Sequence, residues 1–432
     1  MNLVLTARGP VLHGRLLIPL VLLTMPMIAL GRPATEPAAF LLGADISALA
    51  SLERQGVTFR DVDGRPDDAI AIFARHGWNA FRLRLFVNPN GRGGVVNSLE
   101  YTRALAARVK AAGATFMLDL HYSDTWADPQ HQVKPAAWTA LDFPAMEQRV
   151  EDYTRDVLAD LKRHDVLPEV VQIGNEITGG TLWPDAQLRV PPSQVKVFDD
   201  EVRPIEPPAP YDEARQWERL ARIVKAGVRG VRAGTTDADG VRIMIHIDCG
   251  GDWPVTRWFF DHLEAHGVPY DVIGQSYYPQ WHGTLDNVRD TLAQTARRYG
   301  KDIVVIETAY PWKDVNRWAA KPHMAWPVSP QGQRAFLGDL IRAVRETPDE
   351  RGLGVVYWHP ESVPPPAGRG RAWHGGAMAL FDQDGQALPG IDVLRWLHGG
   401  ADVGGNGATT RPRVEIEVQR PHPATQTTTP AR

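Results

Sequence analysis

Eight short β-rich runs alternate with longer stretches of helical periodicity between residues 38 and 400, and this alternation is the strongest constraint on the fold. In the helical stretch 98–113, apolar residues recur at helical intervals until Gly113 ends the helix. Eight strand-helix units in one chain predict an α/β fold, a (β/α)8 TIM barrel that forms a single domain. The runs cover residues 40–45, 80–86, 115–122, 170–176, 241–248, 271–278, 302–308 and 354–360.

Polar or aromatic side chains fall at or near the C-terminal end of every run. In a barrel these ends meet on one face, which is where barrel enzymes build their active sites. A doubly wound sheet is the main alternative, but no GxGxxG or GxxxxGK[ST] loop follows any run. The residues at the run ends are Asp45, Arg84, His121, Glu176, Asp248, Tyr278, Glu307 and Trp358.

The two ends of the chain differ from the part between them. Basic residues precede an apolar run of fifteen residues, 16–30, and Ala29 and Gly31 are the small residues that a signal peptidase favours. Pro19 and Pro26 interrupt this run, which is also short for a membrane span. We expect a signal peptide at 1–31, a linker at 32–37, a folded domain at 38–400 and a flexible tail at 401–432. The protein would be exported to the periplasm or exterior, with no stable membrane association after cleavage.

Charge and composition narrow the possible partners. The net charge is -4 and the basic residues are scattered, so a nucleic-acid partner is not expected. Many of the 14 tryptophans lie beside polar residues or proline, where a flat ring can stack on a sugar. Cys249 is the only cysteine, which excludes an internal disulfide, and we interpret it as a buried small residue rather than a nucleophile.

Two glutamates stand out from the other charged residues. Glu176 ends the fourth run and Glu307 ends the seventh, and neither belongs to a helical i, i+4 charge pattern. A buried carboxylate is costly unless it is paired, so such positions are often functional. Two carboxylates that face each other across a pocket are the minimum equipment for glycoside hydrolysis.

Six long strings make the chain resemble glycoside hydrolase family 53, the endo-β-1,4-galactanases that cut galactan side chains of pectin. They are GADISALASLERQGVTF, RLRLFVNP, LDLHYSDTWADP, VQIGNEITGGTLWP, SYYPQWHGTL and VIETAYPW, spread over residues 42–395. The resemblance implies a retaining barrel enzyme with one catalytic domain. It assigns Glu176 as the acid/base and Glu307 as the nucleophile.

The resemblance also implies the supporting residues of the site. Asn175 would hydrogen-bond the 2-hydroxyl of the attacked galactose, and Arg84 would keep Glu307 ionised and its pKa low. Either Tyr277 or Tyr278 would hydrogen-bond the nucleophile, because alternation along a strand points only one of them inward. The other expected substrate-binding residues are Asp45, His121, Asp124, Trp126, His246, Asp248 and Trp358.

Metal binding is not expected. The spacing of His121, Asp124, Asp128 and His131 fits no zinc pattern, so we interpret this run as a sugar-binding loop. Some family members hold calcium in the loops after the seventh and eighth strands. Here those loops have few clustered carboxylates, so neither calcium nor another cofactor is carried over.

Two departures from the family pattern bear on the substrate rather than on the reaction. Segment 185–216 is long and rich in proline and could wall one side of the cleft, and His359 stands where an acidic residue is expected. Many other families of retaining barrel enzymes also have an Asn-Glu pair on the fourth strand and a Glu on the seventh. The alternatives are therefore a glycosidase acting on mannan or xylan, and a non-catalytic glycan-binding barrel.

Overall fold

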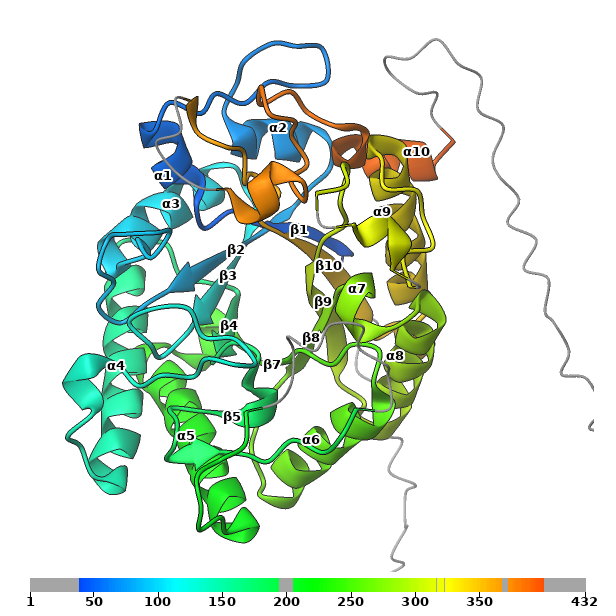
Figure 1. Ribbon diagram of the computed structural model, residues 1–432. Helices are drawn as coiled ribbons and strands as arrows, with labels where there is room; N and C mark the ends of the chain where they lie inside the picture. The colour runs from blue at the N-terminus through cyan, green and yellow to red at the C-terminus, as the bar shows by residue number, and fades with distance from the viewer. Residues whose placement is uncertain (1–38, 194–204, 316, 322, 367–371, 400–432) are drawn as a thin grey trace, which may run out of the picture. The chain divides into compact units, whose positions relative to one another are not determined.

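Eight parallel strands close into a barrel in the computed structural model, which describes residues 39–193, 205–315, 317–321, 323–366 and 372–399. This arrangement, seen along the barrel in Figure 1, confirms the predicted (β/α)8 fold in one domain. The predicted strands agree with the observed ones to within a few residues at each end. In order around the barrel the strands are β1 (Leu41–Asp45), β10 (Gly352–Trp358), β9 (Asp302–Thr308), β8 (Val272–Tyr277), β7 (Arg242–Ile247), β4 (Val170–Ile173), β3 (Thr115–Leu120) and β2 (Ala80–Leu85).

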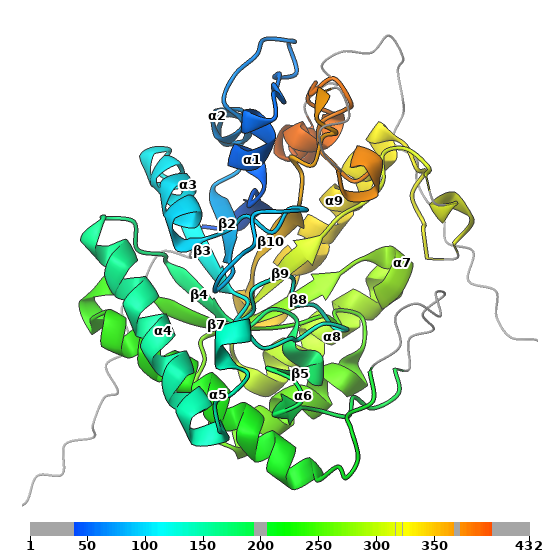
Figure 2. The same cartoon turned by 60° about the vertical axis from the view of Figure 1, so that its left-hand side comes forward.

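Helices surround the barrel, as Figures 1 and 2 show. Several begin at a side chain that caps the first turn: Ser98 accepts a hydrogen bond from the backbone of Tyr101, and Asp142 accepts one from Ala145. No helix among the described residues is long and apolar enough to cross a membrane. The helices are α1 (Leu49–Arg54), α2 (Ala69–Arg75), α3 (Leu99–Ala111), α4 (Phe143–Arg163), α5 (Glu213–Gly234), α6 (Trp253–Ala265), α7 (Pro279–His282), α8 (Leu285–Tyr299), α9 (Pro330–Arg345) and α10 (Val393–Leu397).

The apolar core has two layers because side chains alternate across each strand. On β2, Leu83 and Leu85 face the helices and join the large outer cluster. A smaller cluster fills the inside of the barrel below the functional face, so the barrel is packed rather than hollow. Its buried members are Ala80, Met117, Val170, Met244, Val272, Val304, Ile306, Leu353 and Val356.

A β-bulge in β9 changes which way Glu307 points. Val304 and Ile306 belong to the inner cluster and Val305 to the outer one, so simple alternation would turn Glu307 outward. The register with β8 shifts here, because Gln275 pairs with Val305 while the next residue, Ser276, pairs with Glu307. The extra residue re-aims the glutamate into the barrel, which is a common use of a bulge beside a functional site.

The connection after β4 carries a short antiparallel hairpin, β5 (Gly180–Thr181) and β6 (Ala186–Gln187). Residues 194–204 of the proline-rich segment lie outside the described residues. The described residues of that segment lie away from the lining of the cleft. The predicted signal peptide (1–31), linker (32–37) and tail (401–432) also lie outside the described residues, so those boundaries stay predictions.

Candidate active site

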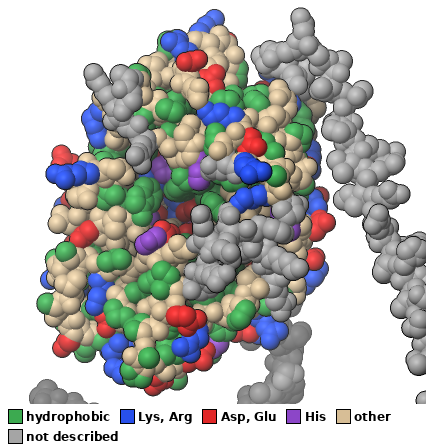
Figure 3. Space-filling model, in the orientation of Figure 1, with side chains coloured by type: hydrophobic (Ala, Val, Ile, Leu, Met, Phe, Trp, Pro, Cys, Tyr) green, Lys and Arg blue, Asp and Glu red, His purple; other side chains and the backbone are tan. Residues whose placement is uncertain are grey.

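A cleft of about 1030 Å³ opens at the C-terminal ends of the strands. The same face is hollowed near its centre, where histidine and acidic side chains gather (Figure 3). Nine of the residues predicted from the sequence line it: Arg84, His121, Trp126, Asn175, Glu176, Asp248, Tyr278, Glu307 and Trp358. The strand ends therefore meet at one site, as expected for a barrel.

Glu307 is held from two sides at the floor of the cleft. Its Oε1 lies 2.7 Å from Nη1 of Arg82, and its Oε2 accepts a hydrogen bond of 3.0 Å from the hydroxyl of Tyr278. Glu307 as a whole is 5% exposed. Burial raises the pKa of Glu307 above its usual value, and the charge of Arg82 opposes that rise. The lowered pKa expected from the sequence is therefore not found.

Arg82, not Arg84, is the partner of Glu307, which corrects the sequence prediction. Both guanidinium groups point into the barrel because the two residues are two positions apart on β2. Arg82 lies one pleat deeper, level with the carboxylates. Arg84 instead lies 3.2 Å from Nε2 of His359 and stacks over the ring of Trp126 at 4.1 Å.

Glu176 occupies a left-handed backbone conformation, with φ 47° and ψ 51°. Gly174, two residues earlier, also has a positive φ of 77°. Non-glycine residues rarely adopt this region, and such strain clusters at functional sites. Glu176 is 8% exposed, and Ser276 Oγ lies 2.6 Å from its Oε1. Burial, followed by the charges of Glu307 and Asp248, raises the pKa of Glu176 well above its usual value.

The two glutamates therefore differ in the way that acid and nucleophile should. The pKa of Glu176 is raised well above its usual value, whereas the rise at Glu307 is opposed by a guanidinium in direct contact. The first proton taken up by the pair belongs on Glu176. A pair of carboxyl groups with pKa values pushed apart is the usual sign of an acid and an ionised partner.

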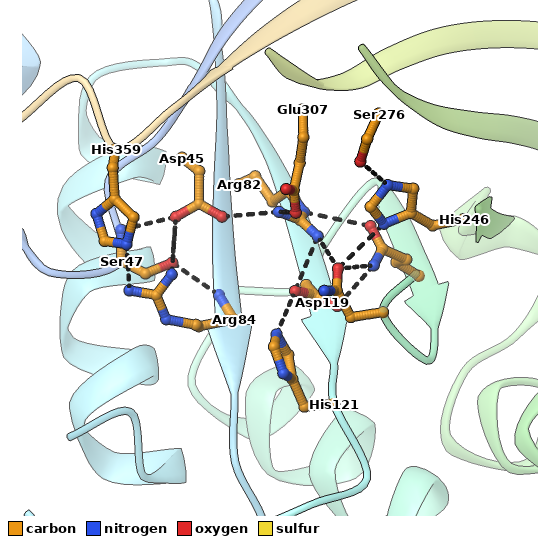
Figure 4. A network of polar contacts seen from close by, with 12 residues as sticks. Asp45, Ser47, Arg82, Arg84, Asp119, His121, His246, Ser276, Glu307 and His359 are labelled. Carbon is orange, nitrogen blue, oxygen red and sulfur yellow. Dashed lines mark hydrogen bonds and ion pairs between the residues drawn. The ribbon is translucent and has the colours of Figure 1, made fainter. Parts of the chain in front are cut away.

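Asn175 lies between the two glutamates in the hydrogen-bond network. It contacts Arg82, the partner of Glu307, and it contacts His246, which leads through Ser276 to Glu176. Its Oδ1 accepts a hydrogen bond of 2.6 Å from Nη2 of Arg82 and lies 3.0 Å from Nδ1 of His246. Its Nδ2 donates to the backbone oxygen of Ala127 at 2.8 Å. An amide nitrogen carries two hydrogens, so one remains to meet a ligand in the cleft. Figure 4 shows this network from close by.

Four of the predicted contact residues are not among those that line the cleft: Asp45, Asp124, His246 and Tyr277. Asp45 is fully buried and pairs with Nη1 of Arg82 at 3.0 Å, so it supports the site from below. His246 is also fully buried, against Asn175 and Ser276. Both side chains point into the barrel but lie too deep to contact a substrate in the cleft. The expectation that they contact substrate is therefore corrected.

Tyr277 and Asp124 each make a hydrogen bond to a backbone group outside the lining of the cleft. Tyr277 faces the outer core, where its hydroxyl donates to the backbone oxygen of Gly283 at 3.2 Å, so Tyr278 is the inward member of the pair. Asp124 accepts a hydrogen bond of 2.8 Å from the backbone of Ala136 and fixes its own loop. Asp124 is not among the residues that line the cleft, and its role as a substrate contact stays a prediction.

The loop after β3 has no metal-site geometry. His121 Nε2 lies 2.9 Å from Asp119, and its Nδ1 accepts from the backbone N–H of Ala127 at 3.0 Å, so both ring nitrogens are occupied. His131 pairs with Asp128 at the exposed end of the loop. Among the described residues, no group of three or more His, Cys, Asp or Glu could hold an ion. That no cofactor is needed stays a prediction.

Aromatic side chains form much of the cleft wall. Trp126 and Trp358 meet edge to face at 6.2 Å, and Trp373 stands perpendicular to Trp358 at 4.4 Å. Trp281 and Trp373 also line the cleft, although neither was predicted from the sequence. The signal was available, because Trp281 lies in the string SYYPQWHGTL. Apolar ring faces beside polar groups suit the alternating faces of a sugar.

A parallel barrel that brings two buried glutamates with separated pKa values to one aromatic cleft has the construction of a barrel glycoside hydrolase. The chain belongs to glycosyl hydrolase family 53, whose profile matches residues 41–394. It is therefore a glycosidase.

Relatives of known sequence or structure agree with this membership. An uncharacterized protein of Niallia circulans is 42% identical over 83% of this chain and 94% of its own. A probable arabinogalactan endo-β-1,4-galactanase A of Aspergillus terreus is 34% identical over 76% of this chain and 87% of its own. The solved family 53 catalytic domain of Ignisphaera aggregans is 32% identical, with a TM-score of 0.72 over 84% of this chain and 98% of its own.

Proposed function

We propose that the protein is an endo-acting, retaining β-1,4-galactanase that hydrolyses (arabino)galactan, the side chain of pectin. The observation that carries the proposal is the pair Glu176 and Glu307 on one cleft of a family 53 barrel. The name of the Aspergillus terreus relative supports galactan as the substrate. The cleft volume of about 1030 Å³ lies just above the range of about 300–1000 Å³ for small-molecule pockets, which favours a chain of sugars over a single one.

In the first step, a carboxylate oxygen of Glu307 attacks the anomeric carbon. The bond from that carbon to the glycosidic oxygen breaks, and Glu176 gives its proton to the departing oxygen. Arg82 and Tyr278 hold Glu307 in place for the attack. In the second step Glu176 takes a proton from water, whose oxygen displaces Glu307 and releases the sugar with its original anomeric configuration.

Substrate positioning is assigned to the groups that remain free on the cleft wall. The second amide hydrogen of Asn175 is available for the 2-hydroxyl of the attacked sugar. The half-buried rings of Trp126 and Trp358 offer faces for stacking.

Incubation of the purified protein with linear β-1,4-galactan tests the proposal. New reducing ends together with rapid shortening of the chain are expected, and proton NMR of the first products should show the β-anomer. Mannan and xylan serve as matched alternative substrates. Faster cleavage of either would move the enzyme to another β-1,4-polysaccharide. Binding of galacto-oligosaccharides without turnover would replace the enzyme by a glycan-binding barrel.

We also propose export to the periplasm or the exterior, on the basis of the basic and apolar residues at 1–31. The mass of the protein recovered from the medium or periplasm, compared with that of the full chain, tests cleavage after Gly31. Recovery of uncleaved protein in the membrane fraction would contradict it.

A further inference from the structure

A chain of three short contacts runs from Glu176 into the wall of the barrel. Ser276 Oγ lies 2.6 Å from Oε1 of Glu176 and 2.9 Å from Nε2 of His246. Nδ1 of His246 lies 3.0 Å from Oδ1 of Asn175. Ser276 and His246 are both fully buried, and Figure 4 shows the contact between them. They reach the substrate only through Glu176 and Asn175.

The partners of Asn175 fix the position of the proton on His246. Oδ1 of Asn175 accepts from Arg82, and Nδ2 donates to the backbone of Ala127, so the amide has one orientation. This Oδ1 oxygen also accepts from Nε2 of Gln172 at 3.1 Å and cannot donate, so its contact of 3.0 Å with Nδ1 of His246 requires the ring hydrogen on Nδ1. The backbone N–H of Glu176 approaches the same Nδ1 at the longer distance of 3.4 Å, and the shorter contact decides the tautomer. Burial, followed by the charge of Arg82, lowers the pKa of His246 well below its usual value. The imidazole is therefore neutral, and Nε2 presents a lone pair to Ser276.

Ser276 then has one hydrogen and two acceptors. While Glu176 is protonated, its O–H donates to Ser276 Oγ, and the Ser276 hydroxyl donates to Nε2 of His246. When Glu176 loses its proton, the hydroxyl turns and donates to the carboxylate. We propose that Ser276 is a positioning residue that holds the Glu176 carboxyl in place in both protonation states. His246 accepts the Ser276 hydroxyl hydrogen whenever Glu176 is protonated. This inference rests on the proposed acid/base role of Glu176.

The reaction supplies the reason for such a device. Glu176 has to be an acid in the first step and a base in the second, and the carboxyl has to stay in place throughout. A hydroxyl can donate or accept simply by rotating, so it can follow the change without movement of the backbone. A fixed donor such as a lysine would favour the carboxylate alone.

The other groups around Glu176 act in the opposite sense to Ser276. Glu307 on β9, Asp248 after β7 and Asp128 after β3 are acidic and raise the pKa of Glu176, whereas the Ser276 hydrogen bond lowers it. Tyr278 after β8 and the neutral His246 on β7 bring no positive charge. Loss of the Ser276 hydroxyl should therefore raise the pKa of Glu176 further.

Two substitutions test the proposal from opposite sides. Ser276→Ala removes the donor to the carboxylate, so the basic limb of kcat/KM against pH should move upward by up to about one pH unit. His246→Asn keeps a side-chain nitrogen near Nδ1 for Asn175 but removes the acceptor at Nε2. The hydroxyl is then free to donate to Glu176 at all times, so the basic limb should move downward. The substrate is linear β-1,4-galactan.

Controls separate this proposal from a merely structural role. Thr295→Val removes a buried hydroxyl from α8 and should leave the pH profile unchanged. A structural role would lower kcat at every pH without moving the basic limb, and this result, or shifts of both variants in one direction, would overturn the proposal. Circular dichroism checks folding. If Ser276→Ala does not fold, His246→Asn still decides the outcome.

Glu176→Ala separates a failure of the proposed acid/base role of Glu176 from a failure of the positioning role of Ser276. If this variant keeps wild-type activity, the acid/base role itself is wrong. If it loses activity while the Ser276→Ala profile coincides with the wild-type profile, the role stands and only the positioning of Glu176 by Ser276 is rejected.

Discussion

The guanidinium of Arg82 lies within ion-pair distance of three carboxylates. Asp45, Asp119 and Glu307 approach it at 3.0, 2.9 and 2.7 Å, and its side chain is 1% exposed. A buried charge of this kind costs several kcal/mol in desolvation unless its partners compensate. Here the partners include the proposed nucleophile, so the ion-pair cluster and the reaction depend on the same residue.

Replacing Arg82 by methionine should therefore affect stability and activity together. Removal of the cation leaves three carboxylates without their partner, and unfolding in urea should show a loss of about 3–5 kcal/mol. The pKa of Glu307 should rise, so the acid limb of kcat/KM should move to higher pH. Arg84→Met leaves those three ion pairs in place and serves as the control. An acid limb that moves only in Arg84→Met would restore the original assignment.

Glu307→Gln should reduce kcat by roughly 10³-fold or more, because an amide cannot form the covalent intermediate. Glutamine has nearly the same shape and can still contact Arg82 and Tyr278, so binding of galacto-oligosaccharides should persist. Calorimetric titration together with the reducing-end assay measures both. Residual activity near the wild-type level would remove Glu307 from the role of nucleophile.

At the scale of single elements, the turn after β4 aims Glu176. Gly174 has φ 77°, and a Cβ at this position would lie 2.6 Å from Cγ2 of Ile177. An alanine here meets both a backbone penalty of about 1–2 kcal/mol and a steric clash. The turn therefore depends on glycine twice, once for its conformation and once for its size.

Gly174→Ala should lower the free energy of unfolding by about 2 kcal/mol or more and reduce kcat, because the shifted turn displaces Glu176. Gly113→Ala is a matched control: its φ is 70°, but nothing lies within 4 Å of the added Cβ. It should lose stability through the backbone alone and keep its kcat. Equal effects of the two substitutions on kcat would show that the turn does not aim the glutamate.

The same elements show what the sequence could and could not predict. Strand-helix alternation was enough for the barrel, and the placement of polar residues at the strand ends was enough for the active-site face. Strand alternation could not separate Arg82 from Arg84, which share a face and differ only in depth. It also predicts the wrong direction for Glu307, because the bulge after Val305 depends on pairing with both neighbouring strands.

Across the whole molecule, the active site is a concentration of buried charge inside an otherwise apolar barrel. A glutamate whose pKa is raised on folding binds its proton more tightly in the folded state. Its effect on stability is therefore favourable or neutral below the usual pKa of 4.5 and becomes unfavourable as the pH rises through the range up to the raised value. Glu176, the proposed general acid, therefore lowers the free energy of unfolding at neutral pH.

Glu176→Gln should consequently make the protein more stable while it removes activity. Glutamine occupies the same space beside Ser276 without a charge, so its advantage should be near zero at pH 4 and should grow with pH. Each unit of pKa rise corresponds to about 1.4 kcal/mol, so at pH 7 the midpoint of thermal unfolding should increase by a few degrees, roughly 1–3 °C. Differential scanning calorimetry of both proteins from pH 4 to pH 8 measures this. A constant or falling difference would show that folding does not raise the pKa of Glu176, which would also remove the basis for its role as the acid.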